Sequence, residues 1–107
     1  MERNVQAIID EIVNSLRKES DEDYCGLWQI EVQLREAGIP SSNRQDIALR
    51  IIRVILEPGD IIPGQFDAGV FHPWSTSADE AIARIRREWD CLGRMPDIGE
   101  IVWFMKP

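Results

Sequence analysis

The sequence predicts an α-rich α+β fold in which residues 1–107 form a single compact domain. Apolar residues recur at helical spacing in four segments, and short β-branched and aromatic runs appear near residue 60 and at the C-terminus. The 107 residues, 44% of them hydrophobic, suffice for one hydrophobic core but not for two ordinary domains. We therefore expect three N-terminal helices, a short strand region, a fourth helix and a C-terminal strand in a small antiparallel sheet.

The first predicted helix has one continuous apolar face. Its members recur at intervals that place them on the same side of a helix: Val5, Ile8, Ile9, Ile12, Val13 and Leu16. Polar residues take the other side, and the periodicity breaks near Lys18. The sequence KESDED that follows is typical of a loop and of the acidic start of a second helix.

The second and third helices are predicted from their apolar faces and their end signals. The second helix, with apolar members between Tyr24 and Ala37, is expected to end at Gly38, because Pro40 beyond it cannot continue a helix. In the third helix, Ser42 and Gln45 have the spacing of a capping box at the start, and the helix is expected to end before residues 58–59.

Extended structure is predicted in two places. Residues 60–62 and 64–66 form short apolar pieces, and residues 99–104 are rich in β-branched and aromatic side chains. We expect the segment 59–62 to pair with the tail 99–104 in an antiparallel sheet. Between them, Ser77 and Glu80 have the spacing of a second capping box, which predicts the fourth helix.

The fourth helix is expected to end at Gly93. Its charged face holds three arginines surrounded by acidic residues, which favours a solvated surface over a nucleic-acid contact: Arg84, Arg86 and Arg87.

Localisation is predicted from the lack of long apolar segments. No uncharged run approaches the roughly 20 residues that cross a bilayer, because Arg50 and Arg53 interrupt the most apolar stretch. The N-terminus carries Glu2, Asp10 and Glu11 where a signal peptide needs a basic start and an unbroken apolar segment. We expect a cytoplasmic protein that does not bind membranes.

Residue types that perform catalysis lack a recognisable arrangement. Cys25 and Cys91 have no metal-binding spacing and are expected to be buried or half-buried thiols. The single imidazole, His72, has no matching nucleophile or carboxylate motif, and no phosphate-binding or calcium-binding loop is present in the sequence. We expect a protein that is not an enzyme, with no catalytic residues, no metal site and no cofactor.

One face of the third helix allows two interpretations. Its polar members share one side of the helix: Asn43, Asp46, Arg50, Arg53 and Glu57. The pairs Asp46–Arg50 and Arg53–Glu57 are four residues apart, which favours a solvated face whose arginines are neutralised locally. The other interpretation is that Arg50 and Arg53 contact DNA phosphates or guanine edges.

The stretch NRQDIALRIIRVILEPGDIIPG resembles, in its order of elements, the recognition helix and wing of a winged helix-turn-helix protein. The resemblance covers roughly residues 21–66. It implies a DNA-binding transcription regulator, with Arg50 and Arg53 on the reading helix and residues 60–66 in the wing. The net charge of −7 opposes the nonspecific attraction to phosphate on which such binding depends.

An acidic segment suggests a different ligand. Its candidate partner-binding residues lie between the first two predicted helices, at the acidic start of the second: Glu19, Asp21, Glu22 and Asp23. A capped, solvated helix start would also explain them. As a partner site, they would attract a basic protein and speed its encounter with the acidic chain.

The chain resembles small bacterial toxin-immunity and antitoxin proteins in its size, its acidic charge, its four tryptophans and its lack of a catalytic motif. The resemblance implies a non-enzymatic inhibitor that neutralises a basic toxin, for example a nuclease, by occluding it. Such a protein would be a monomer or weak homodimer with no nucleic-acid ligand. A third interpretation is a scaffold subunit whose Trp103–Phe104 strand completes another sheet.

Overall fold

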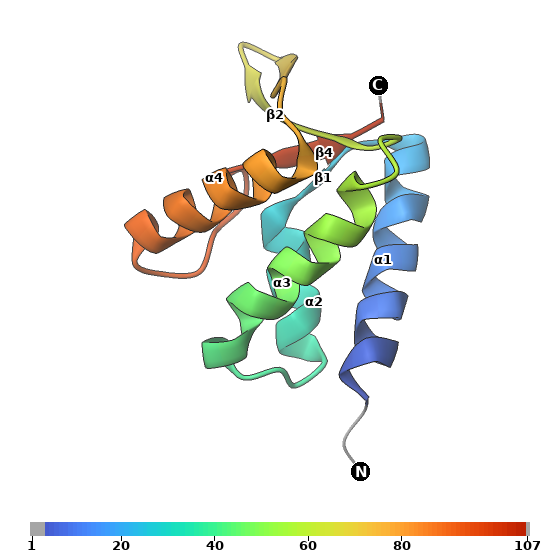
Figure 1. The fold of residues 1–107 in the computed structure, drawn as a ribbon, viewed down its shortest axis with the longest axis vertical. Helices are drawn as coiled ribbons and strands as arrows, with labels where there is room; N and C mark the ends of the chain where they lie inside the picture. The colour runs from blue at the N-terminus through green and yellow to red at the C-terminus, as the bar shows by residue number, and fades with distance from the viewer. Residues whose placement is uncertain (1–3, 107) are drawn as a thin grey trace.

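The computed structural model describes residues 4–106, which form four helices and a four-stranded antiparallel sheet (Figure 1). The elements follow in the order α1 (Val5–Glu22), β1 (Cys25–Gly26), α2 (Leu27–Glu36), α3 (Ser41–Leu56), β2 (Ile62–Asp67), β3 (Val70–Pro73), α4 (Ala78–Leu92) and β4 (Trp103–Met105). The predicted α+β class is confirmed, including the three N-terminal helices and the C-terminal strand in an antiparallel sheet.

The hydrophobic core lies around α3, which contacts α1, α2 and α4 (Figure 1). The apolar side chains predicted for α1 are buried in it from Ile8 to Leu16, whereas Val5 is exposed. In α3, Ile51, Ile52 and Ile55 have no exposed surface. The sheet lies across one end of the helices. Phe104 of β4 is fully buried and belongs to the hydrophobic core.

The first helix is longer than the sequence predicts. It continues through the polar segment to Glu22, so the loop expected after Lys18 is wrong. The physical reason is that Ser20 on the inner side of this segment is buried, with its Oγ 3.6 Å from Cys25 Sγ. The last turn of α1 therefore packs against β1 and is stabilised by a tertiary contact.

The starts of α2 and α3 also differ from expectation. Residues 25–26 form the short strand β1, so α2 begins at Leu27. The N-cap of α3 is Pro40, and Ser42 lies inside the first turn without capping it. The capping box at the start of α4 is confirmed, because Ser77 and Glu80 bond reciprocally.

The strand order in the sheet is β1-β4-β2-β3, so the C-terminal strand lies between two others. Trp103 of β4 is the register partner of Gly26 on one side and of Gly64 on the other. The expected pairing with the tail occurs, but through residues 62–64. Because β4 has a neighbour on both sides, the idea that it completes another subunit's sheet is wrong.

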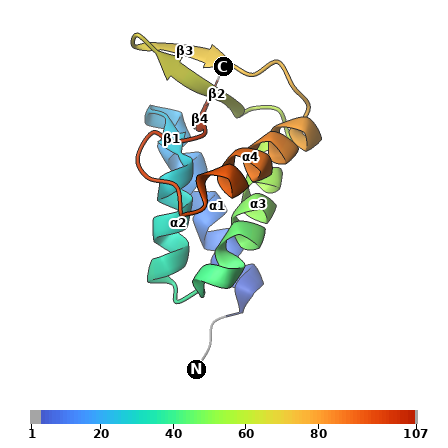
Figure 2. The same ribbon diagram turned by 90° about the vertical axis from the view of Figure 1, so that its left-hand side faces the viewer.

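The hairpin β2–β3 extends beyond the helices (Figure 2). Its two-residue turn contains Ala68 at φ 51° and Gly69 at φ 79°, the positive values that a type I′ turn requires. The sequence does not predict this hairpin, because Ala-Gly is a weaker turn signal than Asn-Gly. No helix within residues 4–106 is long and apolar enough to span a bilayer.

Candidate partner-binding surface

Five aromatic side chains gather on the face of the sheet that points away from the core: Tyr24, Trp28, Phe66, Phe71 and Trp103. We call them the aromatic cluster. Trp103 is central, with ring centroids 4.9 Å from Tyr24, 5.1 Å from Trp28 and 5.6 Å from Phe66. The ring centroids of Tyr24 and Phe66 are 4.8 Å apart, and those of Phe66 and Phe71 are 5.4 Å apart. Ring contacts therefore connect all five side chains. Alternation along β4 turns Trp103 outward because its neighbour Phe104 is buried.

Two glycines create the space for these rings. A Cβ atom at Gly26 would lie 2.2 Å from the Trp28 ring, and one at Gly64 would lie 2.5 Å from the Phe71 ring. Side chains at either position would displace the rings from the sheet. The glycines on both sides of Trp103 therefore allow the aromatic side chains to lie against the backbone.

The aromatic cluster remains open to solvent. None of its members is fully buried, and Tyr24 is 41% exposed. A hollow of about 480 Å³ adjoins the rings at the base of the hairpin, and its lining includes Phe66, Trp103, Asp67 and His72. One exposed and four half-buried aromatic side chains therefore lie next to polar residues, and aromatic residues are enriched in protein-binding surfaces.

Of the four predicted carboxylates, Asp23 lies beside the aromatic cluster, since Tyr24 follows it directly. All four residues are exposed. Glu19 Oε2 accepts a hydrogen bond from Gln29 Nε2 at 2.7 Å, and Asp21 forms an ion pair with Lys106. These two carboxylates are thereby attached to α2 and to the C-terminal segment.

The other two carboxylates have no cationic partner within the part of the chain that the structure describes. Asp23 Oδ1 accepts the backbone N–H of Tyr24 at 2.9 Å, and Glu22 is the last residue of α1. Both can receive a cation from outside the protein. Glu22, Asp23 and Tyr24 therefore place two charges next to an exposed ring.

The sequence indicates the carboxylates and an aromatic loop around Phe71, but not the gathering of the five rings. It assigned Tyr24 and Trp28 to the apolar face of a helix, whereas they lie in the surface cluster. A usable signal was present: Gly26 and Gly64 stand among aromatic residues, and a strand that alternates Trp103 with a buried residue must direct one of them outward.

The thiols differ from each other. The pKa of the Cys25 thiol is raised to about 11, and burial is the main cause. The hydrogen bond with Ser20 lowers this pKa, and the nearby carboxylate of Glu19 raises it. Cys25 therefore remains a protonated thiol at neutral pH, which is a poor nucleophile. Cys91 is exposed on α4, so the expectation of a buried or half-buried thiol is correct for Cys25 and wrong for Cys91.

The polar face of α3 is partly neutralised. Arg53 pairs with Glu57 at 3.7 Å, as expected, and also with Asp79 of α4 at 2.5 Å. The hydrogen bond to Asp79 is the main cause that raises the pKa of Arg53. The expected Asp46–Arg50 pair does not form, and Arg50 has no ion-pair partner among residues 4–106.

No three His, Cys, Asp or Glu side chains of the described residues are placed to share a metal ion. Comparisons with protein-family models, with curated proteins and with solved structures find no significant match to this chain.

Proposed function

We propose that this chain is a non-enzymatic binding protein of the immunity or antitoxin type, which neutralises a basic toxin by occluding it. The observation that carries the proposal is the position of Tyr24, which joins the acidic end of α1 to the aromatic cluster. Aromatic anchors enclosed by a polar rim supply much of the binding energy in protein interfaces.

The two parts of this surface have different physical roles. The net charge of −7 and the carboxylates of Glu22 and Asp23 attract a basic partner from a distance and raise its association rate. Tyr24 and its neighbouring rings then exclude water and slow dissociation. A toxin whose cationic substrate-binding groups are paired with these carboxylates can no longer reach its substrate.

The edge strands of the sheet, β1 and β3, are short, which favours docking through side chains. The edge strand β3 has only four residues and ends at Pro73, which has no N–H to donate. An added strand would therefore gain few backbone hydrogen bonds. A partner gains more by covering the rings than by extending the sheet.

The test begins with a pull-down of the tagged protein from its native cell, with and without nuclease treatment. We expect one basic protein in near-equal amount under both conditions. Recovery of no basic protein, or of one that nuclease treatment removes, contradicts the proposal.

The purified partner then separates the two roles. The double variant Glu22→Gln/Asp23→Asn should slow association at low salt by about tenfold, with little change in dissociation. Tyr24→Ala should speed dissociation, with a loss of about 2 kcal/mol or more. A matched control, Asp10→Asn/Glu36→Gln, removes two charges from exposed sites away from the aromatic cluster and should leave both rates nearly unchanged.

A second candidate is a winged helix-turn-helix DNA-binding regulator. It is favoured by the order α1-β1-α2-α3-β2-β3 and by the unpaired side chain of Arg50. Against it, α4 packs along α3, and Arg53 is held by Asp79 and Glu57. Fluorescence anisotropy with genomic duplexes tests this candidate: specific binding that Arg50→Gln abolishes would support it and would displace the inhibitor proposal.

A further inference from the structure

Three of the four unpaired cations within residues 4–106 lie near one another. Most Lys and Arg side chains within residues 4–106 form ion pairs with carboxylates. Those without such a pair are Lys18, Arg50, Arg86 and Arg87. Lys18 lies on α1. Arg50 and Arg86 line a hollow between α3 and α4, and Arg87 lines an adjoining hollow along α4; together we call these hollows the α3–α4 groove. An acidic protein has enough carboxylates to pair these arginines, yet leaves them available.

The groove follows from the antiparallel packing of α3 and α4. Arg53 contacts Asp79 at one end, and Gln45 Nε2 donates to Asp90 Oδ1 at 2.9 Å at the other. Between these two contacts, Ile82 of α4 is buried next to α3. The polar contacts at both ends hold the two helices at a fixed separation.

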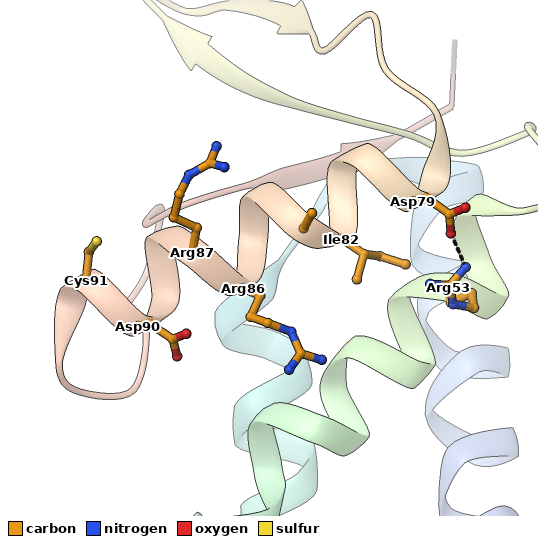
Figure 3. A pocket seen from close by; sticks show the side chains of 8 residues that line it. Arg53, Asp79, Ile82, Arg86, Arg87, Asp90 and Cys91 are labelled. Atoms are coloured by element: carbon orange, nitrogen blue, oxygen red, sulfur yellow. Dashed lines mark hydrogen bonds and ion pairs between the residues drawn. The ribbon is translucent and has the colours of Figure 1, made fainter.

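Two adjoining hollows make up the groove. One, of about 330 Å³, is lined by Arg50, Arg53, Arg86 and Asp46 and by the apolar side chains of Leu49 and Ile82. The other, of about 620 Å³, shares three of these residues and continues along α4 (Figure 3). It also contains Ala83, Arg87, Asp79, Asp90 and Cys91. In Figure 3, Arg86 extends from α4 toward α3.

The charges in the smaller hollow leave an excess of positive charge. Arg53 is already neutralised by Asp79 and Glu57, and Asp46 offsets one of the two remaining arginines. Arg50 and Arg86 therefore face the same space with one uncompensated charge. Guanidinium groups bind phosphate and carboxylate oxygens with two parallel hydrogen bonds, which suits this position to an oxyanion.

We infer that the α3–α4 groove binds a small molecule that carries a phosphate or carboxylate group on an apolar or planar body. The oxyanion lies between Arg50 and Arg86, and the body covers Ile82 and Ala83 beside Arg87. The larger hollow lies within the range of about 300–1,000 Å³ that is typical of small-molecule sites. This site is separate from the aromatic cluster and does not depend on the proposed toxin-binding function.

Three probes measure separately how much the oxyanion and the apolar body contribute to binding: phenyl phosphate, inorganic phosphate and phenol. Binding to the full-length protein is followed by ¹⁵N NMR, with the arginine side-chain signals included. We expect phenyl phosphate to bind about tenfold more tightly than inorganic phosphate because its ring buries apolar surface, and phenol to bind more weakly than either. Saturable shifts should centre on Arg50 and Arg86.

Three variants make this test specific. Arg50→Gln and Arg86→Gln should each weaken phenyl phosphate binding about tenfold, since each removes charged hydrogen bonds. Lys18→Gln removes the same charge outside the groove and should have no effect. Equal weakening by all three variants, or an absence of saturable shifts, overturns the inference. A DNA duplex that binds through Arg50 and Arg86 when phenyl phosphate does not would also overturn it, in favour of the second candidate function.

Discussion

Arg94 and Glu100 form a two-pronged ion pair that closes the loop between α4 and β4, with both N–O distances at 2.6 Å. Glu100 Oε1 also accepts the backbone N–H of Asp97 at 2.7 Å. These contacts, with Arg94 as the main cause, lower the pKa of Glu100 to about 2. The loop leads directly into β4 and thereby positions Trp103.

This ion pair predicts a specific acid dependence. Because the pKa of Glu100 is lower in the folded protein, its stabilising effect is complete above its ordinary pKa of 4.5 and is lost as the pH falls toward about 2. The variant Glu100→Gln should therefore lose less stability than the wild type across this window in thermal unfolding. Both side chains are solvated, so added salt should reduce the difference. Parallel pH curves for the two proteins would contradict the prediction.

Gly64 should be required for the aromatic cluster. In Gly64→Ala, the new Cβ would lie 2.5 Å from the Phe71 ring and 2.5 Å from the carbonyl oxygen of His72. We expect a loss of about 1–3 kcal/mol in the free energy of unfolding, because one of these groups must move. The near-ultraviolet circular dichroism of the rings should change as well.

Gly59→Ala is the control for backbone strain. Gly59 has φ 83°, but no atom lies within 4 Å of a Cβ built there. This variant should lose stability and keep the near-ultraviolet spectrum of the wild type. If the two variants give the same spectrum, the rings do not depend on the space at Gly64.

A buried ion pair joins α2 to α3. Glu31 Oε1 lies 3.1 Å from Arg44 Nη1, and the two side chains are only 5% and 16% exposed. Arg44 Nε also donates to the carbonyl oxygen of Ile39 at 2.8 Å. Glu31→Ala should cost about 2–3 kcal/mol in the free energy of unfolding, because it leaves the half-buried charge of Arg44 without its partner.

Arg35 provides a matched comparison at the same carboxylate. Its Nη1 lies 3.9 Å from Glu31 Oε2, but its side chain is 58% exposed. Arg35→Ala should therefore cost no more than about 0.5 kcal/mol in urea unfolding. Equal losses for Glu31→Ala and Arg35→Ala would show that burial of the Glu31–Arg44 pair is unimportant.

The free energy of unfolding should depend on the residue type at position 68, in the turn of the hairpin. Ala68 has φ 51°, a conformation that Asn adopts more readily than Ala and that β-branched residues strongly disfavour. Ala68→Asn should raise the free energy of unfolding by about 0.5–1 kcal/mol. Ala68→Val should lower it by about 1 kcal/mol or more. Chemical denaturation measures both, and a stabilising valine would exclude this turn type.

Local patterns in the sequence were sufficient to predict that four helices form, although not where each one begins and ends. The apolar spacing from Ile8 to Leu16 and the Ser77–Glu80 capping box depend on residues three or four positions apart, so a single segment contains the whole signal. Errors occurred where a distant contact decided the boundary. The end of α1 is an example, because burial of Ser20 against Cys25 prolongs the helix.

The sequence by itself determined the fold class, the four helices and the acidic balance. Only the tertiary structure decided the place of β4 between β1 and β2, and with it the aromatic cluster that joins Tyr24 to Trp103. The same holds for the groove in which Arg50 of α3 meets Arg86 of α4. Strand pairing and helix packing connect residues that are far apart in the chain, and short strands have too few residues to specify their partners through a periodic pattern.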